Sequence, residues 1–564
     1  MWKECVLLLV ITHISTGIDP HSSQYFSSIR EKVKEIFYHA YNGYLDNAYP
    51  YDELRPLTCD GVNTWGSFSL TLVDALDTLA ILGNYTEFRR VANLLVDTLD
   101  FNQNINASVF ETNIRVVGGL LSAHLLAPKA GMEVDPEWPC KGPLLTLAVD
   151  LAKKILPAFD TQTGMPYGTI NLKYGVDPKE TPETCTAGVG TFLVEFAALS
   201  RLTGDQSFEN IALRAVHALN ASKSALGMIG NHINVVTGKW TALDAGVGAG
   251  VDSYYEYLVK GAIMLNKPEL MDIFKEFLKP IEQHIKQGDW YMWVNMNTGH
   301  TTMPVHQSLD AFWPGLQTLY GDVEKGYKTL LNYYSVWYRY GGTPEFFSIP
   351  HNAPIQKREG YPLRPELIES TLYMYRATKD PALLEFGEAL LYSINATART
   401  ECGFATVKDV RDHTLDNRME SFFLAETIKY IYLLFDPENE LLQTGKGASI
   451  RKMPNGRKCL FGAGGYIFNT EAHPIDVSAL HCCDTMRREQ ERSKTLQLFE
   501  EFDPKRVFEM NRQARDSNRK PQTYHEAEDP TLLNNATDQN VRLGCEPLPY
   551  HMKMSRYGQL FVND

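Results

Sequence analysis

Apolar residues recur up to about residue 435 with the spacing of helices, three or four residues apart. No comparable series of alternating strands is seen in this stretch, so the chain is expected to be all-α. The pattern predicts fourteen helices with approximate cores at 24–48, 67–83, 85–100, 109–127, 142–156, 184–203, 205–221, 250–265, 267–286, 307–320, 322–340, 365–378, 380–396 and 417–434.

The predicted helices alternate between two compositions. Odd-numbered helices are amphipathic, as at 29–37, whereas even-numbered helices are apolar nearly all round, as at 190–196 and 421–424. A helix that is apolar on every side is a buried one, so the even helices should form an inner ring and the odd helices an outer ring. Seven such hairpins predict an (α/α)7 barrel. A superhelical array of the TPR or HEAT type is the alternative, but its concave face is usually polar.

The connections between the predicted helices also alternate. After most even helices the turn is very short, as at 204–205 and 321–322. After odd helices the connection is longer, often roughly twenty residues, and rich in Gly, Pro, Asn and Asp. In an alternating ring, all of the longer connections should therefore lie at one end.

The helical pattern stops after residue 435. A Gly-rich, β-like stretch at 462–470 predicts a small β-hairpin plug near the C-terminal end of the domain. From about residue 484 the chain is charged and polar, which is typical of partial disorder. We therefore expect one helical domain at 18–476 and a C-terminal tail at 477–564.

The N-terminus and the sequons indicate the secretory pathway. Residues 1–17 have the short apolar run and small residues of a signal peptide. No later run of about twenty apolar residues follows, so no membrane span is expected. The net charge of −14 argues against a nucleic-acid partner. Glycosylation sequons lie at Asn84, Asn106, Asn220, Asn395 and Asn535.

Acidic residues gather where the longer connections meet the inner helices. Helix N-termini attract acids through the helix dipole, which explains some of them. It explains poorly why acids adjoin apolar helices, where an unpaired charge is costly. Arg115 and Arg364 are candidate counterions, and a calcium ion with oxygen ligands is another. The acids expected to converge on one mouth are Asp60, Glu111, Asp252, Glu345, Glu366, Glu369 and Glu420.

Paired carboxylates at such a mouth favour glycoside hydrolysis, in which one acid protonates the leaving oxygen and another carboxylate activates water. Glu366 and Glu369 stand three residues apart at a helix start, so they face the same way. Arg364 is expected to keep both ionised.

Six groups of motifs in the chain resemble those of glycoside hydrolase family 47, the class I α-1,2-mannosidases, over residues 30–476. They are Asp52-Glu53-Leu54 with Trp65-Gly66 and Asp74-Ala75-Leu76-Asp77; Phe110-Glu111-Thr112 with Ile114-Arg115; Asp252-Ser253-Tyr254-Tyr255-Glu256-Tyr257; Arg364-Pro365-Glu366 with Glu369-Ser370; Met419-Glu420-Ser421; and Phe468-Asn469-Thr470-Glu471-Ala472-His473-Pro474.

The resemblance implies an (α/α)7 barrel and calcium-dependent hydrolysis with inversion. It implies a proton-donor role for Glu111, water activation by the set that contains Asp252 and Glu366, and a further donor-like acid at Glu345. The sequence leaves open which of these four acids protonates and which deprotonates. Thr470 would bind Ca2+ through its hydroxyl and carbonyl oxygens. Substrate-binding roles fall to Arg115, Arg364, Glu369 and Glu420. For inversion the two catalytic carboxyls should lie about 6.5–9.5 Å apart.

One departure from the family is informative. Processing mannosidases carry a His-Leu-x-Cys-Phe stretch before Pro-Gly, whereas this chain has Ser308-Leu309-Asp310-Ala311-Phe312. It thereby resembles the ER degradation-enhancing α-mannosidase-like branch. That branch implies trimming of high-mannose N-glycans on misfolded glycoproteins in the ER lumen, for ER-associated degradation. A lectin-like receptor that binds mannose without hydrolysing it, and a secreted biosynthetic mannosidase, are the alternatives.

The cysteines outside the signal peptide are expected to form disulfides, since the secretory pathway is oxidising. In a closed ring the first and seventh hairpins are neighbours, which predicts a Cys59–Cys402 bond. Cys140 with Cys185 is a further candidate pair. Cys459, Cys482, Cys483 and Cys545 cannot all be assigned. Cys545 could form a mixed disulfide with a partner such as an ER oxidoreductase.

Overall fold

The computed structural model describes residues 22–483. The predicted signal peptide at 1–17 and most of the predicted tail, with Asn535 and Cys545, lie outside the described residues.

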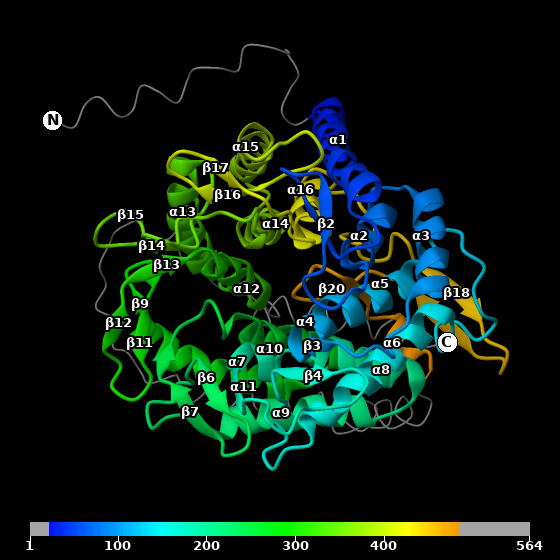
Figure 1. Ribbon diagram of the computed structural model, residues 1–564, viewed down its shortest axis with the longest axis horizontal. Helices are drawn as coiled ribbons and strands as arrows, with labels where there is room; N and C mark the ends of the chain where they lie inside the picture. The colour runs from blue at the N-terminus through cyan, green and yellow to red at the C-terminus, as the bar shows by residue number, and fades with distance from the viewer. Residues whose placement is uncertain (1–21, 484–564) are drawn as a thin grey trace, which may run out of the picture.

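Seven helical segments, which are buried on nearly all sides, form the inner ring (Figure 1). Each packs against the next, and the last packs back against the first, which closes the ring. Every residue of the first segment is buried, in agreement with its apolar sequence. The segments are α2 (Leu70–Ile81), η1 (Thr112–Val117) with α5 (Gly118–Leu126), α8 (Leu193–Thr203), α10 (Asp252–Leu265), α12 (Trp313–Tyr320), α14 (Glu366–Thr378), and η5 (Phe423–Thr427) with α16 (Ile428–Leu434).

The outer helices each bury a single face against this ring. In α3 the buried residues are Phe88, Val91, Ala92 and Leu95, which have the spacing of one helical face. The outer helices are α1 (Ser23–Asn47), α3 (Tyr85–Thr98), α6 (Pro143–Ile155), α9 (Ser207–Ala221), α11 (Pro268–Pro280), α13 (Val323–Tyr340) and α15 (Ala382–Thr397). Two short helices continue outer helices, η2 (Leu156–Phe159) after α6 and η3 (Ile281–Ile285) after α11. Three others lead into inner segments: α4 (Val109–Glu111), α7 (Thr186–Gly190) and η4 (Ser308–Phe312). The short helix η6 (Ala479–His481) follows β21.

The connections contain short antiparallel strands, so the all-α prediction was incomplete. Strands of two to four residues are too short to give a periodic signal in the sequence. They are β1 (Glu53–Arg55), β2 (Asp60–Val62), β3 (Asn106–Ser108), β4 (Thr169–Asn171), β5 (Glu183–Cys185), β6 (His232–Asn234), β7 (Lys239–Ala242), β8 (Asp244–Ala245), β9 (Lys286–Gln287), β10 (Trp290–Tyr291), β11 (Trp293–Asn295), β12 (Thr301–Met303), β13 (Val305–Gln307), β14 (Phe346–Ser348), β15 (Ala353–Pro354), β16 (Thr406–Asp409), β17 (Thr414–Asp416), β18 (Ser449–Lys452), β19 (Lys458–Phe461), β20 (Tyr466–Phe468) and β21 (Pro474–Asp476).

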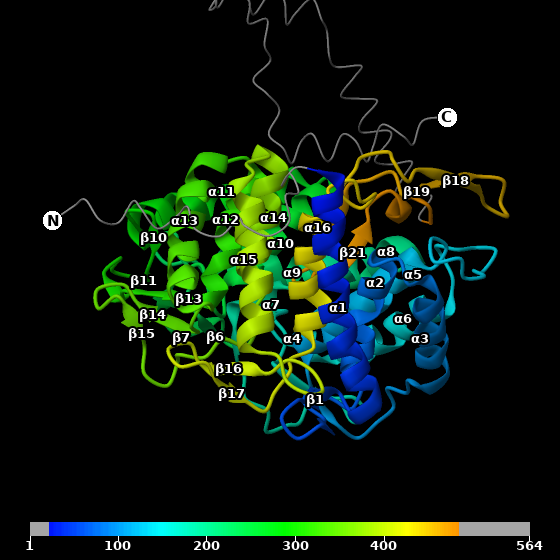
Figure 2. The same ribbon diagram turned by 90° about the horizontal axis from the view of Figure 1, so that it is seen from above.

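The two ends of the barrel differ. Strands β1, β16 and β17 lie at one end, and β18 and β19 lie at the other (Figure 2). Strands β20 and β21 form a hairpin in which Ile467 pairs with Ile475. The loop of this hairpin reaches the inner ring, since Lys260 of α10 and Lys429 of α16 donate hydrogen bonds to its backbone oxygens.

The predicted Cys59–Cys402 pair forms a disulfide with its Cα atoms 6.0 Å apart. Cys140 is bonded to Cys483, and Cys459 to Cys482. The candidate pair Cys140–Cys185 was therefore wrong, and Cys185 is a free thiol. The reason is topological. Cys140 follows an inner helix and Cys185 follows an outer one, so the two lie in connections at opposite ends of the barrel.

None of the helices within residues 22–483 is both long enough and apolar enough to cross a membrane.

Replacing both Cys59 and Cys402 by Ser should lower the free energy of unfolding by about 3 kcal/mol, because the bond closes a long loop in the unfolded chain. Urea unfolding under non-reducing conditions measures this. Cys185→Ser is the matched control, since the Ser hydroxyl can keep the cap that the Cys185 sulfur gives the Gly188 N–H. An equal loss in the control variant would contradict the expectation.

Candidate active site

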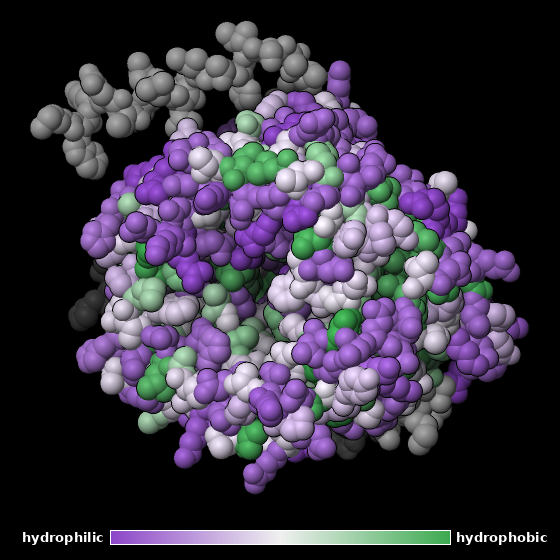
Figure 3. All heavy atoms as spheres, in the orientation of Figure 1, coloured by the Kyte–Doolittle hydropathy of each residue, from purple (hydrophilic) through white to green (hydrophobic). Residues whose placement is uncertain are grey.

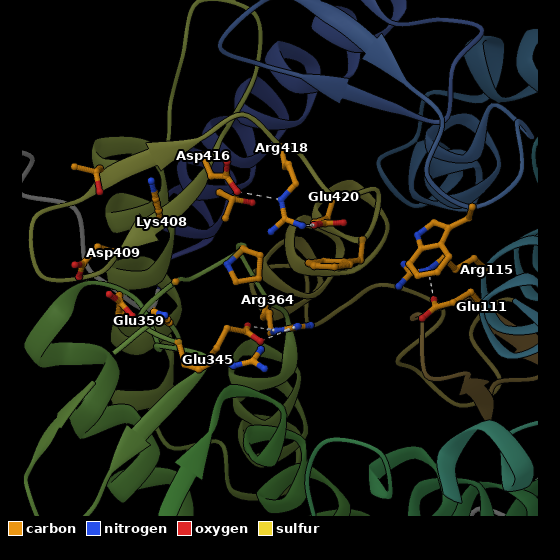
Figure 4. Close-up of a pocket in the computed structure, with 18 residues that line it drawn as sticks. Glu111, Arg115, Glu345, Glu359, Arg364, Lys408, Asp409, Asp416, Arg418 and Glu420 are labelled. Atoms are coloured by element: carbon orange, nitrogen blue, oxygen red, sulfur yellow. Dashed lines mark hydrogen bonds and ion pairs between the residues drawn. The ribbon is translucent and has the colours of Figure 1, made fainter. Parts of the chain in front are cut away.

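A cavity of about 790 Å³ opens at the end of the barrel that carries β16 and β17. Figure 3 shows a hollow near the centre of this face, with hydrophilic residues around much of its rim. We call it the outer cavity. Its lining is mainly charged and comes from several connections (Figure 4). Five predicted site residues line it: Glu111, Arg115, Glu345, Arg364 and Glu420.

A second cavity, of about 240 Å³, adjoins the first, since Glu111, Arg115, Arg364 and Phe422 line both. We call it the inner cavity. Three further predicted residues line it: Asp252, Glu366 and Thr470. The barrel thus brings Glu111, Asp252 and Glu366 to one small space, although each comes from a different inner segment or the helix that leads into it.

Glu111 is held at the boundary of the two cavities by Arg115. Glu111 ends α4, and Ser108 Oγ caps this turn by accepting a hydrogen bond from the Glu111 N–H. Arg115 stands in the π-helical turn that follows, and its Nε donates to Glu111 Oε2 at 2.7 Å. Its Nη1 donates to Glu471 at 2.7 Å and lies 3.6 Å from Asp74. The buried Arg115 guanidinium therefore forms ion pairs with three carboxylates.

Glu345 and Arg364 form the opposite ion pair of the site. Arg364 Nε and Nη2 bind the two oxygens of Glu345 at 2.6 and 3.1 Å, which is the bidentate geometry that arginine favours. Ser308 Oγ donates to the same carboxylate at 3.2 Å. Arg364 Nη1 is 4.0 Å from Glu366 Oε1, beyond hydrogen-bond distance.

Phe422 lies between these two ion pairs. The guanidinium carbons of Arg115 and Arg364 are 5.6 and 5.7 Å from the centre of its ring. Both distances allow cation–π attraction. The ring lines both cavities, so it offers an apolar surface where they meet.

Two carboxyls of the inner cavity titrate near neutrality. Burial raises the pKa of Asp252 to about 7, although the hydrogen bond from the Ser253 N–H opposes this. Burial raises the pKa of Glu366 to about 8 against the attraction of Arg364. Groups poised in this range suit general acid and base catalysis.

The prediction that Arg364 keeps Glu366 and Glu369 ionised was wrong. Burial outweighs the arginine at Glu366, because the guanidinium is already bound to Glu345. Glu369 has another partner, Lys260 Nζ, at 3.7 Å. Burial nevertheless raises the pKa of Glu369 to about 8.

The predicted acids do not all face a cavity. Glu369 is buried, accepts a hydrogen bond from Tyr430 OH and is not part of either lining. Asp60 pairs with Arg55 in the β1–β2 hairpin and is likewise outside both linings. Glu420 lines the outer cavity, where Arg418 Nη1 lies 3.3 Å away.

Sequence reasoning missed a buried network of charges that joins the inner helices to the β20–β21 loop. His473 lies 2.7 Å from Asp77 and 3.2 Å from Asp74, and Lys429 lies 2.7 Å from Asp77. Burial lowers the pKa of His473, but the two carboxylates outweigh it and raise the value to about 9. Glu195 accepts hydrogen bonds from Asn113 and Asn469 in the same region. The sequence offered one sign of this network, namely that several of its charged residues stand within helices that are otherwise apolar.

Within residues 22–483, no group of three or more His, Cys, Asp or Glu side chains could hold a metal ion on its own. The inner cavity is nevertheless rich in oxygen atoms, because Thr470, Glu426 and Glu471 line it with Asp252 and Glu366. Burial first, and then the charge of Glu471, raise the pKa of Glu426 well above its usual range. A hard cation that takes oxygen and water ligands, such as Ca2+, fits this surplus of buried acid.

Comparison with known proteins places the chain in a family. Residues 36–477 match the model of Glycosyl hydrolase family 47. The chain is 55% identical to ER degradation-enhancing alpha-mannosidase-like protein 2 of Mus musculus, over 99% of this chain and 98% of that one. It is 63% identical to the Homo sapiens protein of the same name, over 82% and 80% of the two chains.

Among solved structures, the fold resembles an alpha-1,2-mannosidase from Trichoderma reesei. The TM-score is 0.70 and the identity 25%, over 80% of this chain and 99% of that one. The family's (α/α)7 barrel agrees with the closed ring of helix pairs seen here. The chain therefore belongs to glycosyl hydrolase family 47 and, within it, to the ER degradation-enhancing α-mannosidase-like branch, alongside its second member.

Proposed function

We propose that the protein hydrolyses terminal α-1,2-linked mannose from high-mannose N-glycans of misfolded glycoproteins in the ER lumen, and so directs them to ER-associated degradation. One observation carries the proposal: Glu111 lines a single small cavity together with Asp252 and Glu366, two carboxyls whose pKa values lie near neutrality. The names of the mouse and human relatives and of the Trichoderma mannosidase support the substrate.

In this proposal four carboxyls act as a set. Glu111, in its protonated form, gives its proton to the leaving oxygen, and ionised Glu366 with Asp252 takes a proton from the attacking water, so the anomeric carbon is inverted. Glu345 acts through Arg364, to which both of its oxygens are bound. Phe422, Arg115, Arg364 and Glu420 line the path of the sugar.

Calcium is part of the proposal. Thr470 would hold the ion through its hydroxyl and carbonyl oxygens, with water completing the shell and the buried acids of the inner cavity balancing the charge. A bound cation favours the ionised form of a nearby carboxyl. Glu366 must be ionised to activate water, but burial raises its pKa to about 8. A bound cation would lower this pKa. The β20–β21 hairpin, whose loop carries Thr470, would act as the plug that closes this end of the barrel.

The proposal includes modification and a partner. Asn106 and Asn395 are exposed and Asn220 is half-buried, so these are open to glycosylation, while the Asn84 amide donates a hydrogen bond to Tyr38 OH. Cys545, outside the described residues, would form the mixed disulfide with an ER oxidoreductase.

Glu111→Gln and Glu366→Gln should each lower mannose release from Man9 or Man8 glycans by about 10²–10⁴-fold, because each removes a proton-transfer group. The assay uses purified protein, with and without ER oxidoreductases. Glu359→Gln is the matched control, since Glu359 lines the outer cavity but has no assigned role. Trimming that persists in both site variants would contradict the site. Glycan binding without trimming by the wild-type protein would favour the lectin-like alternative.

The substrate α-mannosyl fluoride can show which residue is the proton donor and which is the base, because its leaving group needs little protonation. Glu111→Gln should retain most of the wild-type rate on this substrate, whereas Glu366→Gln should lose it, because an attacking water is needed in both cases. Fluoride release measures the rates. If Asp252→Asn were rescued and Glu111→Gln were not, the donor would be Asp252.

Without calcium, the free energy of unfolding should fall as the pH rises from about 5 to 8. In the unfolded chain Asp and Glu titrate near pH 4. The folded protein keeps protons on Asp252 and Glu366 up to pH values of about 7 and 8, so it binds more protons than the unfolded chain in this window.

Added Ca2+ should therefore raise the thermal midpoint more at pH 8 than at pH 6, and should restore activity after EDTA. Thr470→Val should abolish both effects. A calcium shift that is unchanged in this variant would contradict the assigned ligand.

A further inference from the structure

A third cavity adjoins Glu366. Its volume is about 10 Å³, and the side chains of Ser308, Trp337, Thr343 and Tyr361 are part of its lining. Arg364 and Glu366 line both this cavity and the inner cavity, so the two spaces meet at these side chains. We call it the rear cavity.

Two polar atoms of its lining residues are buried without a partner. Trp337 Nε1 and Tyr361 OH have no hydrogen-bond partner within residues 22–483. Trp337 is 4% exposed and Tyr361 is 2% exposed. Leaving such a group unpaired costs about 1–3 kcal/mol. The two residues come from different parts of the chain, outer helix α13 and the connection before α14, yet both line the same small space.

The volume of the rear cavity limits which molecule can occupy it. A space of roughly 10–15 Å³ holds one water molecule, provided that two to four polar groups can bind it. The indole N–H, the phenol hydroxyl and the Glu366 carboxyl meet this requirement. A cation is disfavoured by the guanidinium of Arg364, and a sugar hydroxyl would bring more atoms than the space can take.

We propose that the rear cavity holds one ordered water that binds Trp337 Nε1–H, Tyr361 OH and the carboxyl of Glu366. This deepens the proposed function and rests on it, in that Glu366 is the group that activates the attacking water. Arg364 cannot fix the orientation of that carboxyl, since its Nη1 is 4.0 Å away and its other nitrogens are bound to Glu345. The water fixes it from the side away from the inner cavity. Trp337 and Tyr361 are therefore positioning residues.

The test uses Trp337→Phe, Tyr361→Phe and the double variant. Tyr333→Phe is the matched control, because Tyr333 is also buried with an unpartnered hydroxyl and shares α13 with Trp337, but does not line the rear cavity. Each site variant should lower kcat by about 3- to 10-fold, the worth of one hydrogen bond, with KM unchanged. The double variant should lose little more than the worse single one, since both residues hold the same water.

A crystal structure of the wild-type protein gives a readout that does not depend on activity. It should show one ordered water in contact with Trp337, Tyr361 and Glu366, which is absent from the double variant. An empty rear cavity in the wild-type crystal, additive losses in the double variant, or the same loss in Tyr333→Phe would overturn the inference. If the water is present but the wild-type protein trims no glycan, the water site stands and the proposed function falls.

Discussion

Arg115 binds three carboxylates inside a ring of helices that are apolar on nearly every side. A charge in such a place must be paired, because the interior cannot solvate it. Asp74, one of these carboxylates, also pairs with His473. His473 in turn pairs with Asp77, which also pairs with Lys429. These groups belong to four separate segments of the chain. Breaking one pair would leave another charge uncompensated, so the network ties the position of Glu111 to the assembly of the whole ring.

The same surplus of buried acid explains why the site is suited to proton transfer. Arg115 and Arg364 are each committed to a carboxylate, Glu111 and Glu345. Asp252 and Glu366 receive less compensation, and burial moves their pKa values to about 7 and 8. An oxygen-bound cation beside Thr470 and a water behind Glu366 would each complete this arrangement from a different side. The cation follows from the surplus of buried acid in the inner cavity. The water follows from the two polar atoms, Trp337 Nε1 and Tyr361 OH, that lack a partner within residues 22–483.

The sequence predicted the ring because long helices leave a periodic signal, and because apolar inner helices differ in composition from amphipathic outer ones. It predicted the mouth because Glu111, Asp252 and Glu366 all fall where a longer connection meets an inner helix. It could not show which acid meets which cation, since Arg364 was assigned to Glu366 yet binds Glu345. Apart from the β-like stretch at 462–470, the β strands were too short to be detected. The charges within apolar helices, such as Glu195, carried no local sign of their partners.

The most direct measurement of the central claim is the anomer of the first mannose released. Proton NMR during hydrolysis of a Man8 or Man9 glycan can detect it before mutarotation. Water activation by Glu366 on the face opposite the leaving group predicts β-mannose from the wild-type protein and none from Glu366→Gln. Release of α-mannose, or of β-mannose at the wild-type rate from the variant, would contradict the account.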